Sequence, residues 1–268
     1  MAAAPREPSD NPWIRRFHPA PAASSRLVCF PHAGGSASFY FPVSRALSPD
    51  VEVLAIQYPG RQDRRSEPCV DSIEALADAV QDQLPQWFDR PVFFFGHSMG
   101  ATLAFETARR LEGRAVRPAG LFVSGRRAPS RHRDERVHQH SDDQLLADIK
   151  RLSGTDSQVL DDPELMRSVL PAVRSDYKAA ETYRYQPGPA LSCPVFAFTG
   201  DSDPQVTLEE ARSWSEHTEA PFELKAFPGG HFYLNSQATA VIGAIRSRIS
   251  SLRSTSELAQ TSELVQPK

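Results

Sequence analysis

Short apolar runs alternate with helical patterns along most of this chain. Most of the runs are nearly continuous apolar strings, as expected for strands of a parallel sheet that is covered on both faces. They are RLVCF (26–30), VEVLAIQY (51–58), PVFFF (91–95), GLFVS (120–124), PVFAFTG (194–200) and FELKAF (222–227). We therefore predict six strands at these positions, in a mostly parallel central sheet.

Between the runs lie segments with apolar residues at helical spacing. DSIEALADAVQDQL begins at a capping residue, Asp71 or Ser72, and GATLAFETARRLEG ends at Gly113, a residue type that commonly terminates helices. ATAVIGAIRSRISSL (238–252) closes the pattern. This regular alternation favours an α/β fold with helices on both faces of the sheet.

Residues 126–190 break the alternation, because they contain no convincing strand. The segment SDDQLLADIKRLSG has Ser141 as a helix cap. The segment DDPELMRSVLPAVRSDYKAAETYRYQPG has Pro163 at its first helical position, and Pro171 should split or kink this helix. A connection of this length is more than a loop. We predict a helical insertion, at about 130–190, that caps one edge of the sheet.

Composition narrows the functional classes. The net charge of −3 offers no basic footprint for nucleic acid, and no apolar run is long enough to span a membrane. The N-terminus lacks the plan of a signal peptide, which favours a cytoplasmic protein. Three widely spaced cysteines without a CxxC motif favour neither a metal site nor a disulfide. We expect a disordered arm at 1–11, one domain at 12–250 and a disordered tail at 251–268.

The segment GHSMG (96–100) fits the nucleophile-elbow pattern G-x-S-x-G. In this pattern a serine occupies a tight turn between a strand and a helix, and the glycines leave room for the backbone. PVFFF directly before and ATLAFETARRLE directly after supply the strand and the helix that the pattern requires. Because short patterns also arise by chance, Ser98 needs partner groups before it indicates chemistry.

A serine nucleophile needs a base, and the base needs an orienting carboxylate. His231, in FPGGHFYL, follows the last predicted strand after a short glycine loop. The segment TGDSDPQV ends the preceding strand and offers Asp201 and Asp203. We favour Asp203 as the partner of His231, and we expect Asp201 to cap the turn. The chain order Ser98, Asp203, His231 is that of the α/β-hydrolase fold.

An oxyanion hole would complete such a site. The segment CFPHAGGSASFY follows the first parallel strand and resembles an HGGG-type loop, with Ala33 in place of one glycine. The backbone N–H groups of Ala33 and Met99 are the candidate donors to a developing oxyanion. A plain glycine turn is the alternative, and Gly34 and Gly35 suit either.

Several segments together resemble the type II thioesterases, the discrete editing enzymes of modular polyketide synthases and nonribosomal peptide synthetases. The segments are CFPHAGGSASFY, QYPGRQDRRSEP, FFGHSMGATLAFE, SGRRAP, SDYKAAETYRY, TGDSDPQV and FPGGHFYL. The resemblance covers roughly residues 12–250. YPGRQDR and ETYRY are not required by hydrolase chemistry in general, so they distinguish this family from a generic esterase.

The resemblance implies an α/β-hydrolase fold and hydrolysis of aberrant or stalled acyl groups on the phosphopantetheine arm of a carrier protein. It makes Ser98 the nucleophile, His231 the general base and Asp203 the orienting carboxylate. The insertion becomes a mobile lid over an acyl chamber. The implied partners are acyl- or peptidyl-carrier protein domains. We expect a monomer that needs no metal or diffusible cofactor and binds neither nucleic acid nor membrane.

Some features keep two interpretations. Tyr177, Tyr183 and Tyr185 either line the substrate channel or pack the insertion against the body. The segment GRRAPSRHRDER has five arginines between positions 126 and 136, and it either meets a phosphate or an acidic carrier protein or is a solvated loop. The rival functions are a small-molecule esterase or lipase, an acyltransferase on the same fold, and a non-catalytic interaction protein. The complete set of serine, aspartate and histidine argues against the last.

Overall fold

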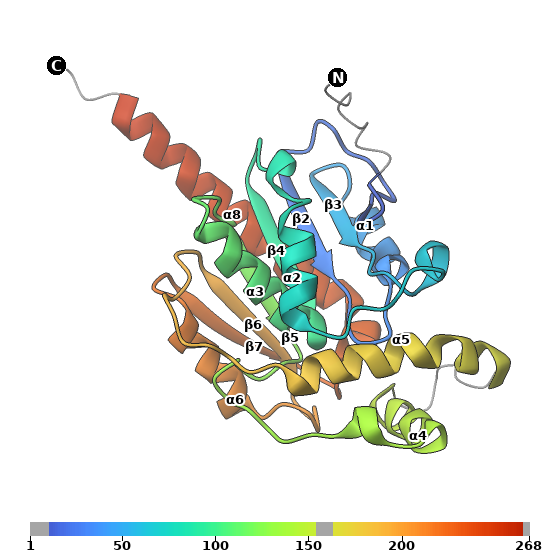
Figure 1. Cartoon of the computed structure of the whole chain (residues 1–268). Coiled ribbons are helices and arrows are strands. Elements are labelled where there is room, and N and C mark those ends of the chain that lie inside the picture. The colour runs from blue at the N-terminus through green and yellow to red at the C-terminus, as the bar shows by residue number, and fades with distance from the viewer. Residues whose placement is uncertain (1–10, 154–162, 265–268) are drawn as a thin grey trace.

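A seven-stranded sheet forms the centre of the molecule in the computed structural model, which describes residues 11–153 and 163–264 (Figure 1). The strand order is β1-β3-β2-β4-β5-β6-β7, and every neighbouring pair is parallel except β1 and β3. The strands are β1 (Ile14–Arg15), β2 (Ser25–Phe30), β3 (Val51–Ile56), β4 (Val92–His97), β5 (Gly120–Ser124), β6 (Val195–Gly200) and β7 (Phe222–Phe227). The six predicted strands are confirmed. The short β1 carries no pattern of its own and was not predicted.

Helices cover both faces of the sheet, with α2 and α3 on one face and α1 and α8 on the other (Figure 1). The α-helices are α1 (Phe41–Leu47), α2 (Ile73–Gln81), α3 (Met99–Glu112), α4 (Asp142–Ser153), α5 (Pro163–Thr182), α6 (Leu208–Arg212), α7 (Tyr233–Ser236) and α8 (Ala238–Leu264). The 3-10 helices are η2 (Ala37–Tyr40), η3 (Gln62–Arg64), η4 (Pro85–Trp87), η5 (Val137–Gln139) and η7 (Ser213–His217).

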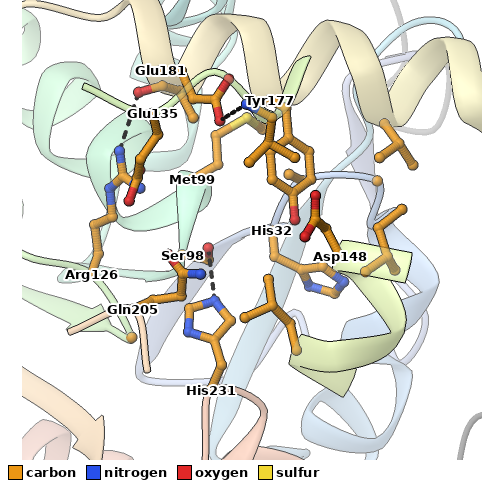
Figure 2. Close-up of a pocket in the computed structure, with 18 of the residues that line it drawn as sticks. His32, Ser98, Met99, Arg126, Glu135, Asp148, Tyr177, Glu181, Gln205 and His231 are labelled. Atoms are coloured by element: carbon orange, nitrogen blue, oxygen red, sulfur yellow. Dashed lines mark hydrogen bonds between the residues drawn. The ribbon is translucent and has the colours of Figure 1, made fainter. Parts of the chain in front are cut away.

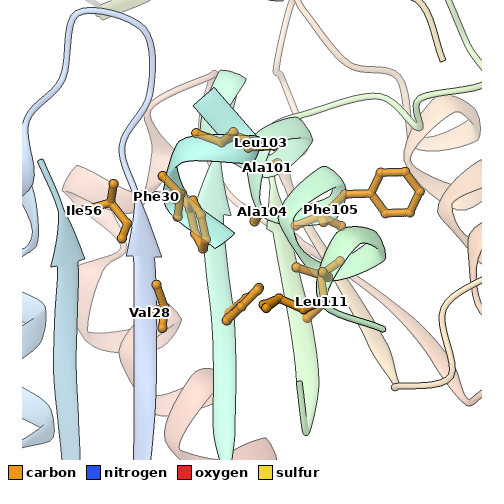
Figure 3. Packing of buried hydrophobic residues seen from close by; sticks show 14 of the residues in the cluster. Val28, Phe30, Ile56, Ala101, Leu103, Ala104, Phe105 and Leu111 are labelled. Carbon is orange, nitrogen blue, oxygen red and sulfur yellow. The ribbon is translucent and has the colours of Figure 1, made fainter. Parts of the chain in front are cut away.

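The sheet separates two hydrophobic cores, and this explains why its strands are apolar at nearly every position. Val28 and Phe30 of β2 face the core under α2 and α3, where Phe105 packs (Figure 3). Leu27 and Cys29 of the same strand face the core under α1 and α8. Successive side chains of a strand point to opposite faces, so a strand covered on both sides needs apolar residues at both.

The strand order creates a crevice at the carboxyl edge of the sheet. The chain leaves β2 for β3 on one side, whereas it leaves β4 for β5 on the other. The loops that follow β2 and β4 therefore diverge, and ligands bind at such switch points in open α/β sheets. Ser98 follows β4 directly, and residues 31–36 follow β2. The topology thus brings the two segments together that the sequence singled out.

Helices α4 and α5 lie across this carboxyl edge (Figure 1). A reciprocal cap begins α4: the Gln144 N–H donates to Ser141 Oγ at 3.3 Å, and the Ser141 N–H donates to Gln144 Oε1 at 3.2 Å. The two helices share a small apolar cluster around Leu145, Leu170 and Val173. The helical insertion is thus confirmed as an architectural feature.

Helix α5 continues through Pro171, so the split that was one of the two predicted outcomes at this residue is wrong. A proline removes one backbone hydrogen bond from a helix. Its neighbours Leu170 and Ala172 are buried, and this packing offsets the loss. Local helix-breaking chemistry is therefore overridden by tertiary contacts at this position.

Helix α8 extends beyond the predicted end of the domain. It continues to Leu264, whereas the sequence analysis expected a disordered tail from residue 251. The two strongest helix breakers, glycine and proline, are both absent between Ala244 and Gln266, which allows the helix to continue. Positions 1–10 of the predicted arm and 265–268 of the tail lie outside the described residues. Within the described ranges, no helix has both the length and the apolarity to cross a membrane.

His217, at the end of η7, is almost fully buried among aromatic rings. Its exposed fraction is 3%, and its ring centroid lies 5.4 Å from that of Phe105 and 4.9 Å from that of Tyr185. Its Nε2 lies 3.0 Å from Ser130 Oγ. Burial lowers the pKa of His217 from 6.5 to about 4. The folded protein therefore holds this imidazole neutral at neutral pH.

We predict that His217 makes the protein acid-sensitive. Below pH 6.5 the unfolded chain takes up a proton that the folded chain refuses until about pH 4, so the stability falls as the pH falls through this window. The loss approaches about 1.4 kcal/mol per pH unit. Urea unfolding at pH 7, 5.5 and 4.5 should show a smaller loss for His217→Gln than for the wild type. Parallel losses in the two proteins would contradict a neutral buried His217.

Candidate active site

Ser98 sits on a strained turn between β4 and α3. Its φ of 54° and ψ of −121° are unusual for a residue with a side chain. A Cβ at Gly96 would collide with the Gly100 carbonyl, and a Cβ at Gly100 would collide with the Phe30 carbonyl. The two glycines therefore allow three backbone segments to touch. The Ser98 N–H donates to the Ser124 carbonyl at 2.8 Å, which fixes the turn against β5.

Three side chains form a chain of hydrogen bonds that starts at this turn. The Ser98 Oγ lies 3.0 Å from His231 Nε2 (Figure 2). On the opposite side of the ring, Nδ1 lies 2.9 Å from Asp203 Oδ2 and 3.1 Å from Oδ1. With the proton on Nδ1, His231 donates to the carboxylate and accepts from the serine hydroxyl. The imidazole is 4% exposed and the carboxylate is fully buried, so water barely screens the interaction.

The structure places the two candidate aspartates in different roles. Asp203 reaches the imidazole and also accepts the Gln205 N–H at 2.8 Å. Asp201 is exposed and caps the turn by accepting the Gly229 N–H at 3.0 Å. That backbone hydrogen bond lowers the pKa of Asp201. Of the two carboxylates, Asp203 is the one in contact with His231.

Ala33 and Met99 both line the cavity that contains Ser98. Met99 is the first residue of α3, so its N–H has no acceptor within the helix. The N-terminal end of the helix also favours negative charge. Ala33 approaches from the loop after β2, on the other side of the crevice. The two predicted donors thus flank the serine from separate elements.

Two further histidines surround His231 without competing for its role. The ring centroid of His97 lies 5.0 Å from that of His231, and His97 Nδ1 lies 2.9 Å from Ser124 Oγ. Burial lowers the pKa of His97 well below 6.5 and that of His32 to about 3, with a smaller contribution from His231 in both cases. Both rings are therefore neutral at physiological pH, and they add no positive charge beside His231.

A cavity of about 460 Å³ opens above Ser98, between the body and the insertion (Figure 2). The wall is largely apolar and combines residues of the insertion with residues of the body of the domain. Its apolar members include Val137, Ile149, Leu152, Val169, Val173, Val206 and Phe232. Such a lining suits an acyl chain, because apolar surface is removed from water on binding.

The side chains of the three tyrosines singled out in the sequence lie in different environments. Tyr177 lines the cavity, and burial raises its pKa to about 12 (Figure 2). Tyr183 instead donates its hydroxyl to Glu106 Oε1 of α3 at 2.7 Å. Tyr185 packs against Phe105. Of the two interpretations left open by the sequence, packing of the insertion against the body holds for Tyr183 and Tyr185, and cavity lining holds for Tyr177.

The arginine-rich segment is largely engaged with carboxylates of the same chain. Arg127 pairs with Glu135 at 2.5 Å, and Arg133 pairs with Glu210 at 2.6 Å. Arg131 pairs with Glu216 of η7 at 2.5 Å. These pairs favour a structural role for the segment over an unpaired phosphate-binding surface. They show why a count of basic residues alone did not decide between the two interpretations.

Arg126 differs from these arginines because its guanidinium lines the cavity without a carboxylate bonded to it. It donates to Thr102 Oγ1 and to the Ala180 carbonyl, both at 3.2 Å. Burial and, to a lesser degree, the neighbouring Arg127 lower its pKa to about 10. It therefore stays charged at neutral pH, and it ties α3 to α5.

Several polar cavity residues were not assigned an individual role from the sequence. They are His32, Arg126, Glu135, Asp148, Glu181 and Gln205. Glu181 accepts the backbone N–H groups of Val137 and His138, at 2.9 and 3.0 Å. The segments SGRRAP and ETYRY, which contain Arg126 and Glu181, were recognised as typical of the family. The resemblance did not assign a role to either residue. Across the described ranges, no group of three or more His, Cys, Asp or Glu residues is placed to hold a metal ion.

Comparison with known proteins places this architecture in a family. The family described as Thioesterase domain matches residues 25–249. Thioesterase PikA5 of Streptomyces venezuelae is 60% identical over 227 residues, which are 84% of this chain and 81% of the relative. The solved structure of the type II thioesterase BorB, from the borrelidin biosynthetic cluster, matches with a TM-score of 0.85 and 54% identity, over 88% of this chain and 97% of that one.

RedJ, a thioesterase from the prodiginine biosynthetic pathway in Streptomyces coelicolor, gives a TM-score of 0.80 at 38% identity, over 85% of this chain and 94% of that one. The match therefore extends over nearly the whole described domain, including the elements that carry Ser98, Asp203 and His231. It confirms the resemblance drawn from the sequence motifs and the α/β-hydrolase fold. The chain belongs to the thioesterase family, as a serine hydrolase that acts on thioesters and is related to the type II thioesterases of polyketide and nonribosomal peptide biosynthesis.

Proposed function

We propose that this thioesterase removes aberrant or stalled acyl groups from the phosphopantetheine arm of acyl- or peptidyl-carrier proteins. The observation that carries the proposal is the hydrogen-bonded series Ser98, His231 and Asp203 at the floor of an apolar cavity. Its relatives from borrelidin and prodiginine biosynthesis support the choice of substrate class. The enzyme acts in the cytoplasm as a monomer, beside its carrier-protein partners.

In the first half-reaction, Ser98 attacks the carbonyl carbon of the thioester. His231 takes the hydroxyl proton on Nε2 as the new C–O bond forms, and Asp203 stabilises the resulting imidazolium. The N–H groups of Ala33 and Met99 donate to the oxygen of the tetrahedral intermediate. When the C–S bond breaks, the imidazolium returns its proton to the sulfur. The pantetheine thiol leaves, and the acyl group remains on Ser98.

In the second half-reaction, water hydrolyses the acyl-enzyme. His231 takes a proton from the water as its oxygen attacks the acyl carbonyl, and the same two N–H groups hold the oxyanion. Collapse of this intermediate returns the proton to the Ser98 oxygen and releases a carboxylic acid. The free carrier thiol is then ready for another cycle. No step requires a group outside the chain, the substrate and water.

The helical insertion acts as the lid of the acyl chamber in this proposal. Val173 and Tyr177 of α5, with Ile149 of α4, line the cavity that contains Ser98. An acyl chain that enters between them exchanges water contacts for apolar ones, which contributes binding free energy in proportion to the area buried. The pantetheine arm remains directed outward, toward the carrier protein.

We predict that Ser98→Ala abolishes acyl release from carrier protein. The purified wild type should free propionate from propionyl-loaded holo carrier protein, and the variant should be slower by roughly 10³-fold or more because it has no nucleophile. Mass spectrometry of the carrier protein measures the loss directly. Binding of the loaded carrier protein should persist in the variant, because its fold and cavity are unchanged.

A panel of small oxygen esters is the matched control for the substrate class. The proposal expects the carrier-bound thioester to have a higher kcat/KM than any of these esters. If the esters turn over rapidly while acyl-carrier protein is left intact, the proposed editing role fails and an esterase role replaces it. Formation of an ester or amide with an added alcohol or amine would instead indicate acyl transfer.

We further predict opposite effects of two neighbouring substitutions. Asp203→Asn should lower kcat by roughly 10²- to 10⁴-fold, because an amide can no longer stabilise the His231 imidazolium. Asp201→Asn should keep kcat within about twofold, because this exposed side chain only caps a turn. Steady-state measurement of kcat for both variants with the same thioester substrate tests this prediction. Loss of activity at position 201 with retention at 203 would reverse the two roles.

A further inference from the structure

A buried ion pair lies against the loop that follows β2 and is not used by the chemistry described so far. Asp176, on α5, is fully buried, and Arg61, in the loop after β3, is 7% exposed. Arg61 Nη1 donates to Asp176 Oδ2 at 2.6 Å, and Nη2 donates to Oδ1 at 2.9 Å. This bidentate pair joins residues that are far apart in sequence, one from the body and one from the insertion.

Both members of the pair also bind the loop that follows β2. Asp176 Oδ2 accepts the backbone N–H of Gly34 at 2.8 Å. Arg61 Nη1 donates to the Gly35 carbonyl at 3.1 Å. Two consecutive residues of the loop are thus held by one ion pair, one through its donor and one through its acceptor. Ala33, the residue before Gly34, is the proposed oxyanion donor.

Helix α5 rests directly on this loop. Gly34 has a φ of +75°, and a Cβ added to it would lie 2.7 Å from Val173 Cγ2. Gly34 is therefore required both by its backbone conformation and by the closeness of α5. Val173, Asp176 and Tyr177 occupy positions i, i+3 and i+4, which lie on one side of a helix. That side forms the cavity wall and holds the loop at the same time.

The segment around Arg61 is itself built into the body. The Tyr58 hydroxyl donates to the Pro31 carbonyl at 3.0 Å, at the start of the loop. Gln57 Oε1 accepts the Ala37 N–H at 2.9 Å, at its end, and Gln57 Nε2 donates to the Arg61 carbonyl at 3.3 Å. The loop is thus held at its start, middle and end by the segment 57–61 and by α5.

A role in geometry explains this arrangement better than a role in stability. A buried ion pair adds little net stability, because removing two charges from water costs about as much as their attraction returns. Oxyanion stabilisation, in contrast, depends on donors that are oriented before the reaction. The Ala33 N–H belongs to a glycine-rich loop, and such a loop needs external contacts to hold a donor in one direction.

We propose that Arg61 and Asp176 are positioning residues of the oxyanion hole. They hold Gly34 and Gly35 so that the N–H of Ala33 faces the tetrahedral intermediate on Ser98. The proposal rests on the assigned roles of Ser98 and Ala33, but it does not depend on carrier proteins as the substrate. It gives a function to Arg61 in YPGRQDR, a segment that distinguishes this family from generic esterases, and to Asp176 in SDYKAAETYRY.

The test compares single variants with the double variant Arg61→Met/Asp176→Leu. Each single change leaves one buried charge unpaired and should shift the urea midpoint downward, whereas the double change should recover most of that shift. The double variant should nevertheless hydrolyse the propionyl thioester of N-acetylcysteamine with a kcat about 10- to 100-fold below that of the wild type. Its KM should stay within about twofold, because the acyl cavity is retained.

Recovery of kcat together with stability would show that the pair is only structural and would overturn the proposal. The same conclusion follows if the loss falls on KM with kcat unchanged. The matched control is Glu106→Gln, which alters another buried carboxylate between body and insertion, one that accepts from Arg109 and Tyr183. It should keep kcat within about twofold, because its partners do not touch the loop after β2.

Phenylboronic acid provides a readout that does not require turnover. It adds to a serine hydroxyl as a tetrahedral anion and so tests the oxyanion hole directly. Calorimetry should show binding to the double variant at least about tenfold weaker than to the wild type and to Glu106→Gln. Equal boronate affinity in all three proteins would overturn the positioning role, whether or not the small thioester is hydrolysed. Failure with carrier protein alone would affect only the proposed substrate.

Discussion

The tight backbone turn at Ser98 is the constraint on which the site depends. A residue with a side chain held at a φ of 54° costs of order 1–3 kcal/mol. The cost is tolerated because β4 is fully buried and pairs with β2 and β5 on its two sides. Contact between the backbones near Gly96, Gly100 and Phe30 leaves no room for a Cβ at either glycine. The turn aims the hydroxyl into the crevice and brings the start of α3 beside it.

The features that could be predicted from sequence are those with a local signature. Strands buried on both faces are continuous apolar strings, and a nucleophile elbow requires glycines at fixed positions. His231 and Asp203 could be found because each follows its own strand, and the carboxyl ends of parallel strands meet at one edge. Their hydrogen-bond geometry in the structure follows from that topology.

The features that sequence reasoning missed depend on pairing across long separations. Arg61 and Asp176 are 115 residues apart, and neither position has a local pattern that indicates its partner. Tyr183 and Tyr185 lie in the same motif as Tyr177, yet they pack against α3 rather than line the cavity. Helix periodicity predicts which residues share one side of a helix. It does not predict whether that side faces the cavity or α3, because this depends on how the insertion packs on the body.

The use of one helix for two tasks limits how this enzyme can change its acyl preference. A shift of α5 that widened the chamber would also displace Asp176 and the loop at Gly34, and so would disturb Ala33, the proposed oxyanion donor. Helix α4 reaches the same chamber through Ile149 and Leu152, whereas the described contacts that hold the loop come from α5 and the segment after β3. Substitutions on α4 can therefore change the acyl preference without moving the oxyanion loop. Substitutions that move α5 change both together.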